Sequence, residues 1–180
     1  MDNTRTSEHS SAAAQRVYTA SVGGSNPSAR TIVDFFESVD GYENKIELAL
    51  RTSLVNVLSL FDKTRLEELT KTEKTILGPV LEAKIKRIFG LESGKCLDYV
   101  ICGQEVDLKF SIKDSWMIPP ECVNKLCLIA TLNLDNDLAF GIFHAKKRFL
   151  NKGRNRDKKR SISKKHYDKI EWIVKGTNNG

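Results

Sequence analysis

Apolar residues recur at helical spacing over two stretches in the first half of the chain. From about residue 43 to residue 62 they follow one face of a helix of about four to five turns. A second stripe begins at Ile76 and stops at Gly90, a residue type that commonly ends helices. Gly78 and Pro79 interrupt this stripe, so the helix either starts at Pro79 or is kinked there. We favour a helix that is kinked or made of two parts.

The second half of the chain alternates apolar and polar residues, a pattern that is typical of β-strands. The stretch CLDYVICGQEVDLKFS, residues 96–111, predicts a hairpin with the two-residue turn Gly103-Gln104. Residues 125–149 predict two more strands joined by a turn at Asp135-Asn136-Asp137. Helices followed by such strands indicate an α/β (or α+β) fold with a small, mixed or largely antiparallel sheet flanked by helices.

A last helix is predicted between residues 161 and 175. Either Ser161 or Ser163 would cap its N-terminus, because a serine hydroxyl accepts the free N–H groups of the first turn. The residues expected to turn inward are Tyr167, Ile170, Ile173 and Val174.

Length and composition limit the class of protein. The chain has 180 residues, which suits one domain. Residues 1–30 are rich in small and polar residues and are expected to be disordered, which leaves residues 31–180 as the domain. The chain lacks both a stretch of ~20 apolar residues, which would span a membrane, and a secretory signal, so we expect a cytoplasmic protein without membrane contact. The four cysteines form no CxxC pair, which predicts reduced thiols and disfavours zinc.

Positive charge is concentrated in one segment. Residues 146–169 hold 12 Lys and Arg against 2 Asp, whereas the rest of the chain holds 17 basic and 21 acidic residues. Such a segment indicates a surface that binds a polyanion such as DNA. The alternative is a disordered, solvated basic tail. The predicted DNA contacts are Arg154, Arg156, Lys158, Lys159 and Arg160.

The predicted hairpin gathers charged residues on one face. With Gly103-Gln104 as the turn, Asp98 lies opposite Lys109 and diagonal to Asp107, and Glu105 shares their face. One reading is a solvent-exposed face with an ordinary cross-strand ion pair. The other is a metal site, because two carboxylates roughly 7–8 Å apart along the backbone can converge on one Mg²⁺. The opposite face is expected to be core: Leu97, Tyr99, Ile101, Val106, Leu108 and Phe110.

Several strings occur in an order that resembles a known family. Asp98, followed nine residues later by Asp107 in the string DLK, resembles the PD-(D/E)xK nuclease motif, with Leu97 in place of the proline. The strings LTKTEKT, EVDLKFS, WMIPPE and NRDKKRSIS resemble the endonuclease domain of the NaeI type II restriction enzymes. The resemblance covers roughly Tyr42 to Trp172.

The resemblance implies a type II restriction endonuclease with a PD-(D/E)xK core, which hydrolyses double-stranded DNA to 5′-phosphate ends with Mg²⁺ as cofactor. Asp98, Asp107 and the backbone carbonyl of Leu108 would hold Mg²⁺, with Glu82 as a direct or water-mediated ligand. Lys109 would orient or activate the attacking water. The family's catalytic residues match Glu82, Asp98, Asp107, Lys109 and Thr72.

Two of these assignments have ordinary structural alternatives. Glu82 lies at the border of its helix's buried face, and such a glutamate is more often simply solvated. Thr72 suits a helix cap equally well. The loop around Trp116 either approaches the DNA groove or places its indole in the core.

The resemblance also bears on assembly. Related enzymes carry a second, C-terminal domain that binds an activating copy of the target, and we expect that domain to be absent from this sequence, which stops at WIVKGTNNG. The alternatives are a fragment, a naturally short version and a second domain that is encoded separately. A palindromic target implies a homodimer, for which the helix at residues 43–62 is one candidate interface. The alternatives are a DNA-binding module that does not cleave and a monomeric nicking or repair nuclease.

Overall fold

The computed structural model describes residues 28–133 and 137–176, so the predictions for residues 1–27 and for the tip of the turn at Asp135-Asn136 fall outside the described residues. At its centre is a six-stranded sheet. Its strands are β1 (Glu92–Ser93), β2 (Tyr99–Ile101), β3 (Gln104–Ser111), β5 (Leu126–Leu132), β6 (Leu138–His144) and β8 (Glu171–Lys175), in the order β1-β2-β3-β5-β6-β8. The β3–β5 pair is parallel and every other pair is antiparallel. The predicted α/β fold with a small mixed sheet is thus confirmed.

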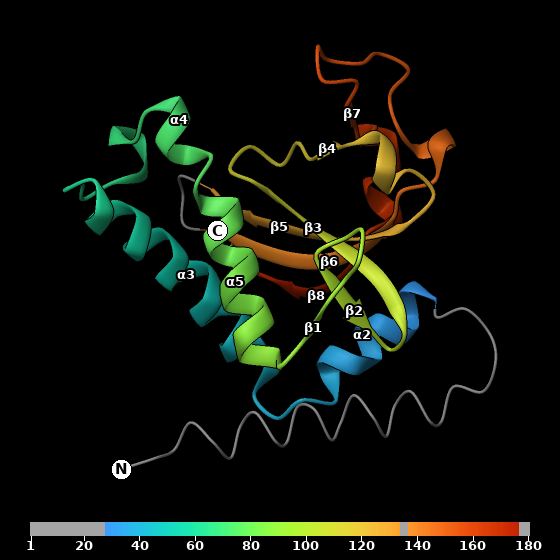
Figure 1. The fold of residues 1–180 in the computed structure, drawn as a ribbon, viewed down its shortest axis with the longest axis horizontal. Helices are drawn as coiled ribbons and strands as arrows, with labels where there is room; N and C mark the ends of the chain where they lie inside the picture. Colours follow the sequence, from blue (N-terminus) through green and yellow to red (C-terminus); the bar gives the residue numbers. More distant parts are fainter. Residues whose placement is uncertain (1–27, 134–136, 177–180) are drawn as a thin grey trace.

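Helices flank this sheet, as Figure 1 shows. The α-helices are α2 (Ala29–Glu37), α3 (Tyr42–Leu60), α4 (Lys71–Lys74) and α5 (Leu77–Phe89). A second, two-stranded sheet pairs β4 (Met117–Ile118) with β7 (Arg160–Ser161). The short 3₁₀ turns are η1 (Leu66–Glu68), η2 (Pro120–Cys122), η3 (Lys147–Phe149) and η4 (Lys164–Lys169). No helix among the described residues is long and apolar enough to cross a bilayer.

The predicted helices of the first half are largely confirmed. Helix α3 matches the stretch at residues 43–62, and the second stripe falls in α5, with α4 as a separate short helix ahead of it. The boundary between α4 and α5 lies at Thr75 and Ile76, so the start or kink predicted at Pro79 is wrong. Pro79 instead sits in the first turn of α5, where a missing N–H removes no intrahelical hydrogen bond. Gly90 ends α5 with a φ of 59°, a left-handed conformation that favours glycine.

The hairpin forms, but with a different turn. Ile101 pairs with Gln104, so the turn residues are Cys102 and Gly103, with φ of 51° and 78°, as in a type I′ turn. The predicted turn is therefore wrong, because a left-handed cysteine is not expected from sequence. Pairing shifts by two residues, which leaves the side chains of β2 and β3 on their predicted faces. Continued one residue beyond β2, this register places Asp98 opposite Asp107.

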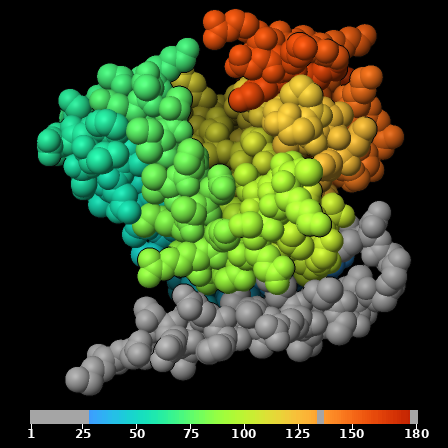
Figure 2. Space-filling view, viewed as in Figure 1, coloured from blue at the N-terminus to red at the C-terminus, as the bar shows by residue number. Residues whose placement is uncertain are grey.

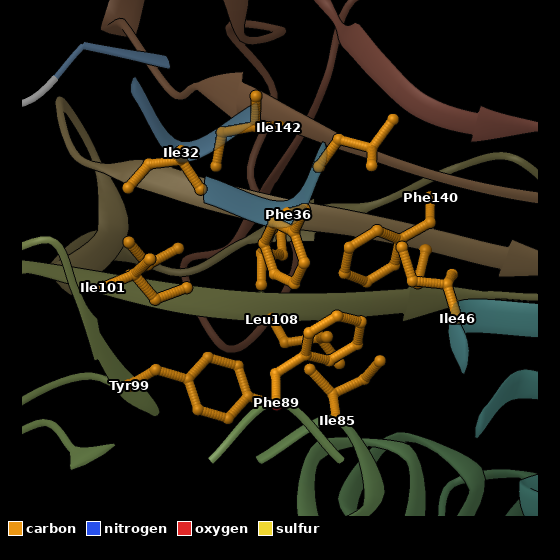
Figure 3. Packing of buried hydrophobic residues seen from close by; sticks show 14 of the residues in the cluster. Ile32, Phe36, Ile46, Ile85, Phe89, Tyr99, Ile101, Leu108, Phe140 and Ile142 are labelled. Atoms are coloured by element: carbon orange, nitrogen blue, oxygen red, sulfur yellow. The ribbon is translucent and has the colours of Figure 1, made fainter. Parts of the chain in front are cut away.

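One face of the sheet packs against α2, α3 and α5 and forms the larger core (Figure 3). Phe36 of α2 is fully buried there, with edge-to-face contacts to Phe89 at 4.9 Å and to Phe140 at 5.4 Å between ring centroids. Four of the six residues predicted for the hairpin's core face lie in this cluster: Tyr99, Ile101, Val106 and Leu108. Leu97 does not, because it precedes β2 and packs on the other side of the sheet, and Phe110 is only half-buried.

The opposite face is covered by loops and the small β4–β7 sheet. Trp116 is 2% exposed, and its indole N–H donates a hydrogen bond to the Ala130 carbonyl at 2.8 Å. This confirms the core alternative for Trp116. One member of this second cluster, Cys122, contacts Asp107, one of the carboxylates described below.

The helix predicted between residues 161 and 175 is wrong. The segment instead forms β7, the turn η4 and the strand β8, which pairs with β6. Ser163 precedes η4, but its hydroxyl makes no capping hydrogen bond. A bulge at Phe140 and Gly141 lets β8 approach closely, since a Cβ at Gly141 would lie 2.7 Å from the Glu171 carbonyl oxygen. The apolar residues of this segment are spaced as in a helix of only about four turns. Pairing of β8 with β6 therefore decides its structure.

Candidate active site

Asp107 lies at the centre of the charged face of β3. It is buried, with 5% of its surface exposed. Its Oδ2 accepts a hydrogen bond from Cys122 Sγ at 3.0 Å and forms an ion pair with the ammonium of Lys109. The predicted solvent-exposed face with an Asp98–Lys109 ion pair is therefore wrong, since Lys109 pairs with Asp107 in a largely buried setting.

Asp98 reaches the same place from the loop that precedes β2. Its Oδ2 accepts a hydrogen bond from the Leu108 N–H at 2.7 Å, and its carboxyl lies close enough to that of Asp107 for the two groups to interact. The predicted diagonal arrangement is thus replaced by one in which Asp98 lies opposite Asp107. Because the N–H and C=O of one strand residue point to the same side, the Leu108 carbonyl is also directed toward this edge of β3.

Glu105 holds the loop that carries Asp98. Its Oε1 accepts hydrogen bonds from the backbone N–H groups of Lys95 and Cys96, the second at 2.9 Å. Gly94 closes the same loop, because its N–H donates to the Asp98 carbonyl at 3.3 Å and a Cβ there would collide with the backbone three residues later. From the sequence alone, Glu105 has no clear role. The alternation of apolar and polar residues shows which face of the hairpin Glu105 lies on, but not that it contacts a loop nine residues away.

Glu82 approaches the pair from α5. The hydroxyl of Tyr99 donates to the Glu82 backbone carbonyl at 2.9 Å, which ties α5 to β2. The Glu82 side chain is half-buried, and its charge acts on Asp98. The position at the border of the buried face therefore agrees with the prediction from helical spacing.

The electrostatics of the cluster reflect three carboxyls close together. Burial raises the pKa of Asp98 to about 7; the Leu108 N–H opposes this rise, while Asp107 and Glu82 add to it. Burial acts to lower the pKa of Lys109, but its hydrogen bond to Asp107 and the surrounding negative charge outweigh burial and raise it. Near neutral pH Lys109 is thus a cation, and Asp98 is readily protonated.

Thr72 is the one predicted catalytic residue that lies apart. It is exposed on α4, one helix before the helix of Glu82. The cap of α4 is Thr70, whose hydroxyl accepts from the Glu73 N–H at 3.3 Å, so the capping alternative for Thr72 is wrong. The structure gathers Glu82, Asp98, Asp107 and Lys109 in one cluster.

The basic segment is not a free tail. Residues 151–159, here called the basic loop, are anchored at their base, where Asn151 N–H donates to the Ser161 carbonyl at 2.9 Å. At the tip, Asn155 Oδ1 accepts from the Lys159 N–H at 2.9 Å. Arg154, Arg156 and Lys158 are exposed, whereas Lys159 and Arg160 are half-buried. A pocket of about 240 Å³ is lined by Pro120, Val123, Lys147, Arg154, Lys158 and Arg160.

A second basic pocket was missed by the sequence reasoning. It measures about 300 Å³ and lies between α4 and the residues after β3. Three lysines line it, Lys71, Lys74 and Lys113, and are here called the lysine wall. Serine and threonine hydroxyl groups line the rest of its polar surface. In Figure 2 the surface is hollowed between α4 (green) and the basic loop (orange-red). The signal in the sequence was weak because these lysines are distributed over two segments that only the fold brings together.

Comparison with known proteins bears on this arrangement. The family model described as restriction endonuclease NaeI matches residues 30–178, most of the chain. A type II restriction enzyme NaeI from Lentzea aerocolonigenes is 37% identical over 100 residues, which cover 54% of this chain and 31% of that enzyme. The chain thus matches less than a third of the length of this relative. The extent of the family match, together with the acidic cluster on β3, shows that the chain belongs to the NaeI restriction endonuclease family.

Proposed function

We propose that this domain cleaves double-stranded DNA at a specific site, as a Mg²⁺-dependent type II endonuclease of a restriction–modification system that leaves 5′-phosphate ends. The observation that carries the proposal is the convergence of Glu82, Asp98, Asp107 and Lys109 at β3. Membership of the NaeI family supports it.

The donor set suits a hard divalent cation. Carboxylate oxygens are offered by Asp98, Asp107 and Glu82, and the Leu108 carbonyl is directed to the same edge. These are suitable ligands because Mg²⁺ prefers oxygen. Burial is the main reason that the pKa of Asp98 is raised, and the neighbouring carboxyls of Asp107 and Glu82 raise it further; a divalent cation would relieve the repulsion among them. Bound there, Mg²⁺ would supply Lewis-acid chemistry by neutralising charge on the scissile phosphate.

Lys109 has a different part in this mechanism. Its ammonium is held by Asp107 and stays charged near neutral pH, so it is suited to orient an attacking water and to stabilise the negative phosphoryl oxygens. A cation cannot accept a proton, and we therefore assign Lys109 to positioning and electrostatics rather than to general-base catalysis. Thr72 is retained as a peripheral contributor only.

We infer that DNA lies in the hollow between two basic surfaces. The basic loop and Arg160 would contact phosphates from one side, and the lysine wall from the other. Arg154, Arg156 and Arg160 also have the planar donors that recognise guanine in the major groove. The hollow thereby directs the duplex toward the acidic cluster.

Cleavage of both strands of a palindromic site requires two such clusters, so we include a cytoplasmic homodimer in the proposal. Helix α3 is the favoured interface because it exposes three large apolar side chains. These are Leu48 at 56%, Val55 at 57% and Leu60 at 65% exposed. Residues 31–180 are taken as the endonuclease domain.

The test is digestion of plasmid DNA with and without Mg²⁺ by the wild type and by Asp107→Ala. Discrete fragments that require both Mg²⁺ and Asp107 would support a site-specific endonuclease, and sequencing of their ends would give the target and the 5′-phosphate. Asp40→Ala is the matched control, because Asp40 is an exposed aspartate between α2 and α3. It should cleave as the wild type does.

Two outcomes would favour the alternatives. Salt-sensitive DNA binding without cleavage would indicate a binding module. Strand-specific nicks, together with a monomeric mass in light scattering, would indicate a nicking or repair nuclease.

A further inference from the structure

Asp107 belongs to a second group of side chains besides the acidic cluster. One carboxylate oxygen of Asp107 and the sulfur atoms of Cys122 and Cys127 all lie within 4.8 Å of one another. All three residues are buried, and Cys122 Sγ is 3.0 Å from Asp107 Oδ2. The two thiols are reduced and unbridged.

The fold, rather than any sequence motif, builds this group. In the parallel register of β3 and β5, Asp107 lies beside Cys127, so their side chains share one face of the sheet. Cys122 comes from η2, the turn that leads into β5, and folds back onto the same face. The absence of a CxxC pair, which disfavoured zinc from sequence, therefore did not exclude a cysteine pair in space.

The three donors suit a thiophilic cation rather than Mg²⁺. Zn²⁺ and Cd²⁺ bind thiolate and carboxylate together, usually in a tetrahedron whose ligand atoms lie about 3–4 Å apart, whereas Mg²⁺ does not select sulfur. The three ligand atoms, all within 4.8 Å of one another and with one pair at 3.0 Å, lie close to that range. On binding, the two thiol protons leave to solvent, and the three negative ligands balance the divalent cation together with the Lys109 ammonium.

We propose that Asp107, Cys122 and Cys127 form a binding site for a thiophilic divalent cation of the Zn²⁺ class. Asp107 is shared with the acidic cluster, so this cation and Mg²⁺ compete for one carboxylate. Occupation of the thiol site would hold the domain in an inactive form that a thiophilic chelator reverses. The inhibitory effect rests on the proposed nuclease function, whereas cation binding does not.

The ordinary explanation for the pair is packing, because buried cysteines behave as small apolar residues. Cys122 and Cys127 do lie among apolar neighbours such as Ile118 and Ile129. Packing alone, however, does not require both sulfurs to converge on a carboxylate oxygen. The two explanations differ in whether the folded protein binds one thiophilic cation per chain.

The binding test uses the metal-free, reduced full chain titrated with Cd²⁺, whose bonds to thiolates absorb in the near ultraviolet. We expect one Cd²⁺ per chain with an absorbance typical of two thiolates. Cys127→Ala should lose about half of this absorbance, and Asp107→Asn, which keeps both thiols, should bind Cd²⁺ at least tenfold more weakly. The controls Cys102→Ala and Cys96→Ser remove thiols outside the group and should leave the titration unchanged. Circular dichroism checks that each variant is folded.

A folded wild type without the absorbance, or with an absorbance that Cys127→Ala leaves intact, would overturn the site. The inhibitory step is tested by Zn²⁺ added to Mg²⁺-dependent plasmid cleavage, with each variant's rate compared with its own rate without Zn²⁺. Inhibition should be at least tenfold weaker in Cys127→Ala than in the wild type, and equal inhibition of the two would overturn it. If no variant cleaves DNA, the proposed function fails while the Cd²⁺ titration still decides the binding site.

Discussion

The two faces of strand β3 differ in what they contribute. Leu108 points into the core formed with α2, α3 and α5, where it belongs to a large cluster of buried apolar side chains. Asp107 and Lys109, on either side of it in sequence, point to the opposite face, where Asp107 pairs with Lys109 and the nearby Asp98 has a raised pKa. Adjacent residues of one strand therefore separate stability from chemistry, and each face can be altered without the other.

The largest expected effect is on catalysis from the charged face. Asp107→Asn should lower the rate of DNA cleavage by more than about 100-fold, because loss of even an outer contact to a metal ligand costs roughly 10- to 100-fold. The free energy of unfolding should change little, because relief of the repulsion on Asp98 opposes the loss of the charge that pairs with Lys109. Cleavage kinetics and urea unfolding measure the two. A large loss of stability in this variant would mean that the two faces are not separable.

Leu108→Ala is the matched change on the other face. It should lower the free energy of unfolding by about 2–5 kcal/mol, the range for leucine truncation in a packed core. The backbone N–H of residue 108, which donates a hydrogen bond to Asp98, remains in place. The rate of cleavage, measured at a temperature where the variant is folded, should therefore fall by less than about tenfold. Loss of cleavage as large as that of Asp107→Asn would contradict the division of roles.

Local alternation was enough to predict this division, but not its surroundings. A period of two along β3 places Asp107 and Lys109 together whatever the rest of the fold does. The contact of Asp107 with Cys127 depends on the parallel pairing of β3 with β5, which is not encoded locally. Strand β8 was mistaken for a helix because its spacing permits both, and only pairing with β6 decides between them.

The third expected effect concerns the loop that carries Asp98. Glu105→Ala removes the acceptor for two backbone N–H groups, so the loop should loosen and cation affinity should fall by about 10- to 100-fold. Calorimetric titration with Mg²⁺ measures this change. Glu92→Ala, which removes an exposed acid of β1, is the control and should bind as the wild type does. Equal losses in both variants would show a general charge effect instead of positioning.

The fourth effect is the dependence of stability on pH without metal. Asp98 has a folded-state pKa of about 7, above its ordinary value of 3.8, so the folded state binds the proton more tightly. The contribution of Asp98 is therefore favourable at low pH and is lost as the pH rises through about 7. The charged groups that face this carboxyl are Asp107, Glu82 and Lys109. The substitution Asp98→Asn removes the titrating group and preserves the hydrogen bond from the Leu108 N–H. Asp98→Asn should thus be more stable than the wild type at pH 8, and the difference should shrink toward pH 5; urea unfolding in EDTA at both pH values measures it.

The smallest effect separates the acidic cluster from the basic surfaces around it. If Lys71 and Lys74 each neutralise one DNA phosphate, Lys71→Ala/Lys74→Ala should reduce the slope of log affinity against log salt by about two. Binding should weaken for all sequences alike, because phosphate contacts carry no base information. Fluorescence anisotropy at several salt concentrations measures the slope. The double variant Lys45→Ala/Lys63→Ala alters lysines of α3 and the turn after it and should retain the wild-type slope; a slope unchanged in both double variants would place DNA contacts on the basic loop alone.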